Sequence, residues 1–183
     1  MTEPSTTEHV LVAIKTEEEG RAFYLQAAGK ASHPLARDTF AALAADEEHH
    51  LRSLKDVYTR IHYIGAEDQV WEQPVVTEAG VETQDLPRRI KTIFSKALKR
   101  ADTQVKPDTQ LLEIYTMATN FERAGIEFYG ELAEEENDPR AKQFYAALQE
   151  MEQHHLTLQE NSLQLLENPA QWFSQQERWM IEG

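Results

Sequence analysis

The sequence predicts an all-α protein, a four-helix bundle made of two duplicated helical hairpins. Its composition favours helices, because Ala, Glu, Leu and Gln are plentiful and the 183 residues include only seven Gly and seven Pro. The chain also aligns with itself at an offset of 105 residues. In each copy, apolar residues recur every three or four positions in two segments, which a short proline-containing break separates.

The first hairpin is expected over residues 7–63. Its first helix has apolar or small residues at helical spacing from Val10 to Tyr24. A break at Ser32–Pro34 interrupts this pattern, and its proline suits the first turn of a following helix. A second apolar stripe follows the break. Because the break is short, the two helices are expected to pack antiparallel.

The second hairpin, residues 107–166, follows from the internal repeat. Residues Ala13–Leu51 match Ala118–Leu156 without a gap, and 15 of the 39 aligned positions are identical. The identical positions include glycine, proline, tyrosine and histidine, which unrelated helices rarely share in register. Asp138 is expected to cap the second helix of this hairpin. We interpret the repeat as an ancestral duplication.

A long segment, residues 64–106, joins the two hairpins. Gly and Pro break its first half, and the apolar spacing of its second half predicts a helix over residues 86–101. A crossover of this length is compatible with the ferritin-like topology of four-helix bundles. The tail, residues 167–183, is expected to form a short helix on the bundle or on a second subunit. Residues 1–183 are therefore expected to form a single domain.

The charge and composition argue against several classes of function. A net charge of −14 disfavours nucleic-acid binding, which needs a basic surface. No apolar run approaches the roughly 20 residues that cross a bilayer, and the start of the chain lacks signal-peptide features, so a cytoplasmic location is expected. The chain has no cysteine. Any metal must therefore be held by oxygen and nitrogen ligands, and electrons must come from another molecule.

Four glutamates and two histidines occupy positions in the stripes that face the core. In the first hairpin, Glu17 shares a helix face with Tyr24. Glu47 lies three residues before His50, so both side chains point inward from adjacent turns. The repeat places their counterparts equivalently. The six predicted metal ligands are Glu17, Glu47, His50, Glu122, Glu152 and His155.

A buried cluster of this composition requires cations. An unpaired buried charge is strongly destabilising, so four carboxylates in the core would favour protonation or unfolding. Two divalent ions balance four negative charges and leave the histidines neutral. Oxygen and imidazole ligands suit iron or manganese, whereas zinc fits the ligands but offers no redox chemistry. Two iron ions are the expected cofactor, with manganese as the alternative.

The position of each residue in its helix suggests its role. Glu47 and Glu152 lie beside the histidines and are expected to bridge the two metals, while the other four residues bind one metal each. Tyr24 and Tyr129 are candidate catalytic residues, because their hydroxyls could reach a metal-bound carboxylate. A purely packing role for the two tyrosines is an equal alternative.

A second pair of histidines, His49 and His154, also survives the duplication. Asp46 lies three residues before His49, but Met151 takes the equivalent place before His154. This Asp-x-x-His register is not duplicated, so we expect these histidines beside the metal site or at the surface.

Four motifs in the chain resemble the rubrerythrin-type branch of the ferritin-like superfamily. They are EEEGRAFY at Glu17–Tyr24, DEEHH at Asp46–His50, FERAGIEFY at Phe121–Tyr129 and MEQHH at Met151–His155. Together they cover most of the four predicted helices. The resemblance implies a non-haem di-iron centre, usually in a homodimer, that reduces hydrogen peroxide or oxidises ferrous iron.

The chain departs from rubrerythrins proper in two respects. Those proteins carry a four-cysteine, rubredoxin-like domain that supplies electrons, whereas this chain has no cysteine. They also carry an additional glutamate one turn after the terminal glutamate of the second half, where this chain has Gly125. The remaining ligand set is symmetric and closer to the ferroxidase centre of bacterioferritins.

The expected function is a rubrerythrin-like di-iron oxidoreductase that reduces hydrogen peroxide with electrons from an external donor protein. Ferroxidase or other iron-handling activity is the alternative, and a non-enzymatic metal-binding module is the third possibility. The basic residues of the 86–101 helix could dock an acidic donor, or they could neutralise the acidic bundle. The sequence does not decide whether the hairpins pair within one chain or exchange between two.

Overall fold

Four long helices dominate the computed structural model, which describes residues 5–64, 70–71, 93, 109–168 and 171–172. No strand occurs within these ranges. The predicted all-α bundle of two hairpins is therefore confirmed, and the hairpins span residues 6–64 and 109–167. The helices are α1 (Thr6–Lys30), α2 (Pro34–Ile64), α5 (Thr109–Glu135) and α6 (Pro139–Glu167).

Local sequence signals fix where the helices begin. Ser5 caps α1 in a capping box: its side chain accepts a hydrogen bond from the Glu8 backbone, and the Glu8 carboxylate accepts one from the Ser5 backbone at 2.8 Å. The predicted cap of α6 is confirmed, because Asp138 accepts a hydrogen bond from the backbone of Arg140 at 2.8 Å. Both hairpin turns are short, and the second helix of each hairpin begins at a proline, Pro34 in α2 and Pro139 in α6.

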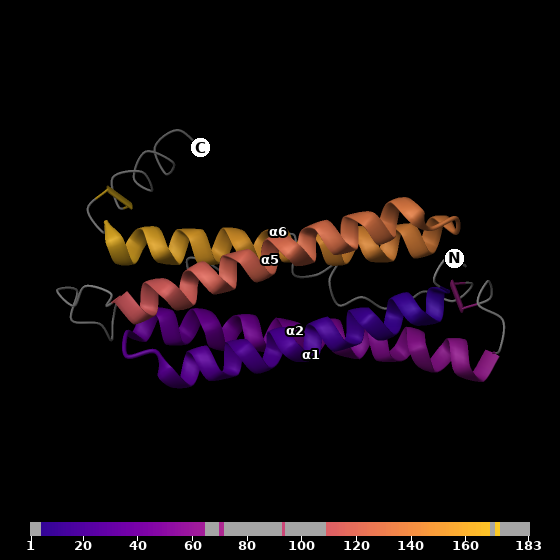
Figure 1. Ribbon diagram of the computed structural model, residues 1–183, viewed down its shortest axis with the longest axis horizontal. Coiled ribbons are helices and arrows are strands. Elements are labelled where there is room, and N and C mark those ends of the chain that lie inside the picture. Colours follow the sequence, from indigo (N-terminus) through magenta and orange to yellow (C-terminus); the bar gives the residue numbers. More distant parts are fainter. Residues whose placement is uncertain (1–4, 65–69, 72–92, 94–108, 169–170, 173–183) are drawn as a thin grey trace.

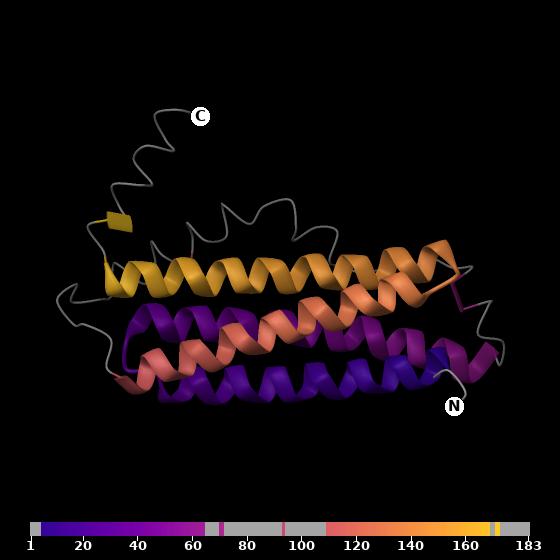
Figure 2. The same ribbon diagram turned by 45° about the horizontal axis from the view of Figure 1, so that its top comes forward.

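The order of the helices is that of a ferritin-like bundle. Within each hairpin, α1 packs against α2 and α5 against α6; between the hairpins, α1 contacts α5 and α2 contacts α6. Helix α2 ends at one end of the bundle and α5 begins at the other, so these two helices run in the same direction (Figures 1 and 2). Residues 65–108 therefore connect opposite ends of the bundle.

Two apolar clusters fill the bundle, and each of the four helices contributes to both. One cluster contains Tyr24, Phe40, Tyr115 and Leu158 among others. The other contains Ala13, Leu54, Tyr129 and Leu148 among others. Within the described ranges, none of the helices combines the length and apolarity that a bilayer crossing requires.

Most of the predicted crossover helix over residues 86–101 and most of the tail lie outside the described residues. Trp71 is buried, and its ring lies 5.5 Å from that of Phe144 between centroids. In the tail, Trp172 is buried in the cluster that contains Tyr24, so this part of the tail packs onto its own bundle. The single domain over residues 1–183 stays a prediction.

Candidate metal centre

A layer of buried charged residues lies between the two apolar clusters. Each helix contributes one or two side chains to it, and none of the six exposes more than 3% of its surface. The structure thus brings together all six residues that the sequence singles out. They are Glu17 on α1, Glu47 and His50 on α2, Glu122 on α5, and Glu152 and His155 on α6.

The six side chains form two groups of potential ligands that share two glutamates. In each group, one ligand atom from every residue lies within 4.8 Å of the others. Two adjacent metal ions bridged by carboxylates require this sharing. The His50 position comprises Glu17, Glu47, His50 and Glu152, and the His155 position comprises Glu47, Glu122, Glu152 and His155.

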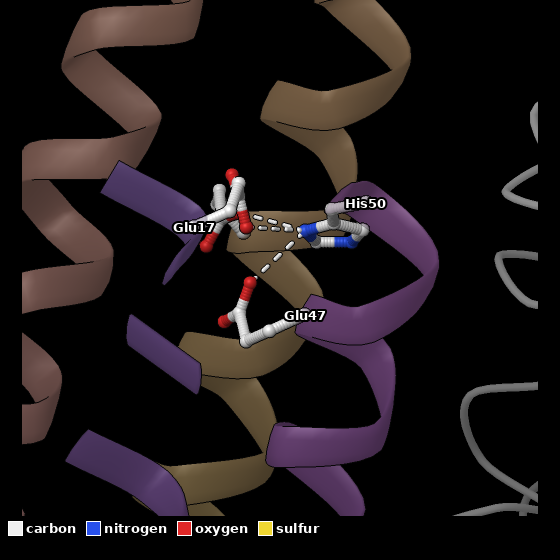
Figure 3. A group of neighbouring side chains, drawn as sticks. Glu17, Glu47 and His50 are labelled. Atoms are coloured by element: carbon white, nitrogen blue, oxygen red, sulfur yellow. Dashed lines mark hydrogen bonds and ion pairs between the residues drawn. The ribbon is translucent and has the colours of Figure 1, made fainter. Parts of the chain in front are cut away.

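At the His50 position, one imidazole nitrogen faces three carboxylates. The Nδ1 atom of His50 lies 3.0 Å from Oε2 of Glu17, 3.2 Å from Oε2 of Glu47 and 3.4 Å from Oε1 of Glu152. The other nitrogen, Nε2, points away from Glu17 and Glu47 (Figure 3). It is buried and has no hydrogen-bond partner in the described part of the chain.

The His155 position has a different arrangement around its imidazole. The Nδ1 atom of His155 lies 3.5 Å from one oxygen each of Glu47, Glu122 and Glu152, and it makes no hydrogen bond to any described residue. Its Nε2 atom lies 3.4 Å from Oδ2 of Asp46. The histidine rings of the two positions stack with centroids 5.2 Å apart.

Several buried ligand atoms lack hydrogen-bond partners among the described residues. A buried polar atom without a partner costs about 1–3 kcal/mol, so a concentration of them needs an explanation. All of these atoms belong to the two ligand groups, where a cation would satisfy them, and the residues therefore fit a pair of metal ions. The atoms are both carboxylate oxygens of Glu47, Oε2 of Glu122, Oε1 of Glu152 and Nδ1 of His155.

Two tyrosines connect the hairpins through the non-shared glutamates. The hydroxyl of Tyr24 on α1 donates a hydrogen bond to Glu122 on α5, and the hydroxyl of Tyr129 on α5 donates one to Glu17 on α1. Both rings are fully buried in the apolar clusters. The tyrosines thus combine packing with a direct contact to a potential metal ligand.

Burial and neighbouring charges change the pKa values of the glutamates in opposite directions. Loss of solvation raises the pKa of Glu17 and of Glu122 well above the usual range. The charges of Glu47 and Glu152 add to this effect at Glu17, and the charge of Glu152 adds to it at Glu122. Loss of solvation also opposes ionisation of Glu47 and Glu152. Close polar contacts with one terminal glutamate and with both histidines outweigh it and lower the pKa of both shared carboxylates.

The histidines compensate the remaining negative charge when no metal is bound. Burial disfavours the imidazolium form, but attraction to Glu17 raises the pKa of His50, and attraction to Glu122 raises the pKa of His155. The carboxylates around them therefore favour the imidazolium form of both histidines in the metal-free protein.

Asp46 and Gln159 are two buried residues at the site that the sequence did not assign to it. Asp46 contacts Nε2 of His155, and the Gln159 amide donates hydrogen bonds to Oε1 of Glu122 at 2.7 Å and to the Tyr24 hydroxyl at 2.9 Å. Neither residue is duplicated, so the internal repeat gives no signal for them.

The second pair of histidines, His49 and His154, lies outside both ligand groups. Both side chains are partly exposed, which agrees with the expectation that they lie beside the site or at the surface.

Two glycines allow close packing at the site, Gly125 against the shared carboxylate of Glu152 and Gly20 against the ring of Phe121. A Cβ atom at Gly125 would lie 3.2 Å from Cγ of Glu152, and one at Gly20 would lie 2.7 Å from Cε1 of Phe121 and 3.7 Å from Cδ of Glu47. A side chain at Gly125 would therefore require Glu152 to move.

The fold and the buried cluster together define the class: a four-helix bundle whose core holds two overlapping groups of carboxylates and histidines that could bind metal ions. The model of the rubrerythrin family matches residues 8–162. The chain therefore belongs to the rubrerythrin family, a family of di-iron proteins, and the resemblance of its motifs is confirmed. Searches of curated proteins and of solved structures gave no match.

Proposed function

We propose that this chain is a non-haem di-iron oxidoreductase that reduces hydrogen peroxide. One peroxide molecule, two electrons and two protons give two water molecules. When bound, two iron ions supply the two electrons by passing from the ferrous to the ferric state. The observation that supports the proposal is the pair of ligand groups that share Glu47 and Glu152 inside an apolar bundle.

The residues of the chain have separate roles in this proposal. Glu47 and Glu152 would hold both ions, because both groups of ligands contain them. The remaining four ligands are terminal, with one glutamate and one histidine at each position. Tyr24 and Tyr129 fix the two terminal glutamates through their hydroxyls and close the site from its two apolar ends. We assign the tyrosines a positioning role at the catalytic centre.

The proposed partners follow from the composition of the chain. It contains no cysteine and therefore no cysteine-bound iron centre that could store electrons, so we propose an external donor protein. We also propose a homodimer, the usual state that the family resemblance implies. Sedimentation or size-exclusion measurements on the full chain test the dimer directly.

Ferroxidase activity, with Fe²⁺ as the substrate, is the second candidate. One observation favours it: Gly125 occupies the place of the additional glutamate of rubrerythrins proper, so the ligand set is symmetric between the two hairpins. The same residues would hold the iron in both functions. The two proposals differ in which oxidant reacts and in whether iron leaves the site after oxidation.

Metal content and one oxidation step test the proposal. Protein purified without added metal is analysed for metal, then loaded with Fe²⁺ without oxygen and mixed once with peroxide or with O₂. We expect about two irons per chain, with peroxide oxidising them much faster than O₂ does. Repeated turnover of excess Fe²⁺ would favour the ferroxidase, and bound zinc without oxidation chemistry would favour a structural metal site.

Matched variants show whether the proposed residues hold the metal. The pair Glu47→Ala and Glu152→Ala removes both shared carboxylates and is expected to abolish metal binding. Glu18→Ala is the control, because Glu18 is exposed and pairs with Lys55 at 2.8 Å on the surface. Binding that survives loss of both shared carboxylates would contradict the assignment.

A further inference from the structure

The two halves of the site are related by the 105-residue offset, but they are not equivalent. Asp46 aligns with Met151, and Gln159 aligns with Leu54, so each repeat has one polar residue where the other has an apolar one. All four residues are buried. Both polar residues contact ligands of the His155 position.

Asp46 supports the imidazole of the His155 position. Its carboxylate lies 3.4 Å from Nε2 of His155, the nitrogen that does not face the glutamates. A carboxylate at this place fixes the tautomer and orientation of a histidine ligand and raises its basicity. The equivalent residue in the repeat is Met151, and Nε2 of His50 has no hydrogen-bond partner within the described ranges.

Gln159 supports the terminal glutamate of the same position. Its amide donates a hydrogen bond of 2.7 Å to Oε1 of Glu122, the oxygen that also accepts from Tyr24. The amide also contacts the Tyr24 hydroxyl at 2.9 Å, so the three side chains hold one another. In the repeat, Leu54 replaces the glutamine and offers no donor to the other terminal glutamate.

The ligand atoms themselves show a third difference. At the His50 position, Nδ1 of His50 is hydrogen-bonded to Oε2 of Glu17 at 3.0 Å, so a metal must first break this bond. At the His155 position, Nδ1 lies 3.5 Å from three carboxylate oxygens and forms no hydrogen bond with a described residue. This position needs less rearrangement before it can bind a cation.

We propose that the His155 position binds metal first and more tightly, and that the His50 position is the one where metal exchanges. Asp46 and Gln159 are the positioning residues that create this difference. The inference rests on the proposed dimetal centre. Loss of an outer hydrogen-bond partner of a metal ligand typically weakens binding about 10- to 100-fold, and we expect an affinity difference of this order.

Single-position variants measure the two affinities separately. His50→Ala removes a ligand from one position and leaves the His155 position, whereas His155→Ala does the reverse. Each full-length variant is titrated with Co²⁺ in the absence of oxygen, with visible absorption and equilibrium dialysis as readouts and circular dichroism to confirm helicity. We expect His50→Ala to retain the tighter binding, by about 10- to 100-fold.

The supporting residues are then tested in both backgrounds. Asp46→Asn keeps the shape of the side chain, and we expect it to weaken Co²⁺ binding in the His50→Ala background and to leave the His155→Ala background unchanged. Met151→Asp is the converse change and is expected to strengthen binding in the His155→Ala background. In the otherwise intact chain, Gln159→Leu is expected to weaken the tighter of two binding steps, so this test does not depend on loss of a ligand.

The outcomes separate this inference from the proposed function. Equal Co²⁺ affinities in the two histidine variants, or equal losses from Asp46→Asn in both backgrounds, would overturn the inequivalence and leave the dimetal centre intact. A tighter His50 position would overturn it as well. If the unsubstituted chain bound no Co²⁺, Fe²⁺ or Mn²⁺, the metal centre itself would be wrong, and the inference with it.

Discussion

The hydroxyl of Tyr129 donates a hydrogen bond to Oε1 of Glu17, although the two residues are 112 positions apart and lie on different hairpins. Tyr24 makes the reciprocal bond to Glu122. Each terminal glutamate thus takes its tyrosine partner from the opposite hairpin. Both hairpins of one chain build the layer of charged residues, and neither hairpin contains a complete ligand group.

Removing the tyrosine hydroxyl tests this link between the hairpins. Tyr129→Phe leaves Oε1 of Glu17 without its donor, so we expect the metal-free protein to lose about 1–3 kcal/mol of unfolding free energy. Metal binding is also expected to weaken, by about 10-fold or more, because the carboxylate is less well oriented. Urea unfolding of the metal-free protein and a Co²⁺ titration measure the two effects.

Tyr145→Phe is the matched control for that prediction. Tyr145 is fully buried in the same apolar cluster as Tyr129, but its hydroxyl has no hydrogen-bond partner in the described parts of the chain. Replacing an unpaired buried hydroxyl with hydrogen should be neutral or stabilising. Equal losses in the two variants would show that the Tyr129 hydroxyl contributes nothing specific.

Metal loading is expected to release protons. The pKa values of the two terminal glutamates and the two histidines are raised, so these groups favour their protonated forms in the metal-free protein. Since ligands bind metal deprotonated, two divalent ions should displace protons from these groups near neutral pH. Titration of unbuffered protein with Zn²⁺ measures the number of protons released per chain without redox chemistry. Release close to zero would contradict the raised pKa values.

The same four groups determine how the stability of the metal-free protein depends on pH. Each has a higher pKa in the folded state, so the folded chain binds more protons than the unfolded chain and the unfolding free energy falls as the pH rises. The stabilisation is present below the unfolded values, about 4.3 for Glu and 6.5 for His, and disappears as the pH passes the folded values.

Thermal unfolding of metal-free protein between about pH 6.5 and pH 9 checks this sign. We expect Tm to fall across the range, and we expect saturating Mn²⁺ to reverse the trend, because ions replace the displaced protons. A metal-free protein whose Tm rises with pH over this range would contradict the raised pKa values.

The repeat explains which parts of the site could be predicted from the sequence. Glu17 and Glu47 interrupt apolar stripes, and the duplication preserves them, so periodicity and the repeat together identify the candidate ligands that the structure brings together. The tyrosines could be placed in the core by the same stripes, but their hydrogen-bond partners lie on the other hairpin and depend on how the hairpins pack. Asp46 contacts His155 and Gln159 contacts Tyr24, each on the opposite hairpin. Neither residue has a polar counterpart in the other repeat, so no duplicated pattern marks them.

The helix boundaries could be predicted from local sequence signals, whereas the path of the crossover could not. The cap at Asp138 and the proline at Pro139 are local signals, and the structure begins α6 where they predict. The direction of α5 relative to α2 depends on a connection of more than 40 residues, in which local patterns predict a helix but not the path of the chain. The ferritin-like order was therefore compatible with the sequence, and the structure was needed to establish it.

The glycine beside a shared carboxylate allows a last prediction. Gly125→Ala adds a Cβ atom 3.2 Å from Cγ of Glu152, which forces the shared carboxylate to shift. In the middle of α5 the change also gains helix propensity worth about 0.5–1 kcal/mol. We expect the two effects on unfolding free energy to cancel or to leave a net loss, while metal binding at both positions becomes weaker.

Gly29→Ala separates the propensity gain from the displacement of the carboxylate. Gly29 lies in the last turn of α1, is exposed, and has nothing within 4 Å of an added Cβ among the described residues. This variant should gain up to about 0.5–1 kcal/mol of unfolding free energy and bind Co²⁺ like the unsubstituted chain. Because both metal positions use Glu152, Gly125→Ala should weaken both Co²⁺ binding steps, whereas Gln159→Leu should weaken only one. If Gly125→Ala stabilised the protein as much as Gly29→Ala and left both steps unchanged, the close approach of α5 to Glu152 would have no role in metal binding.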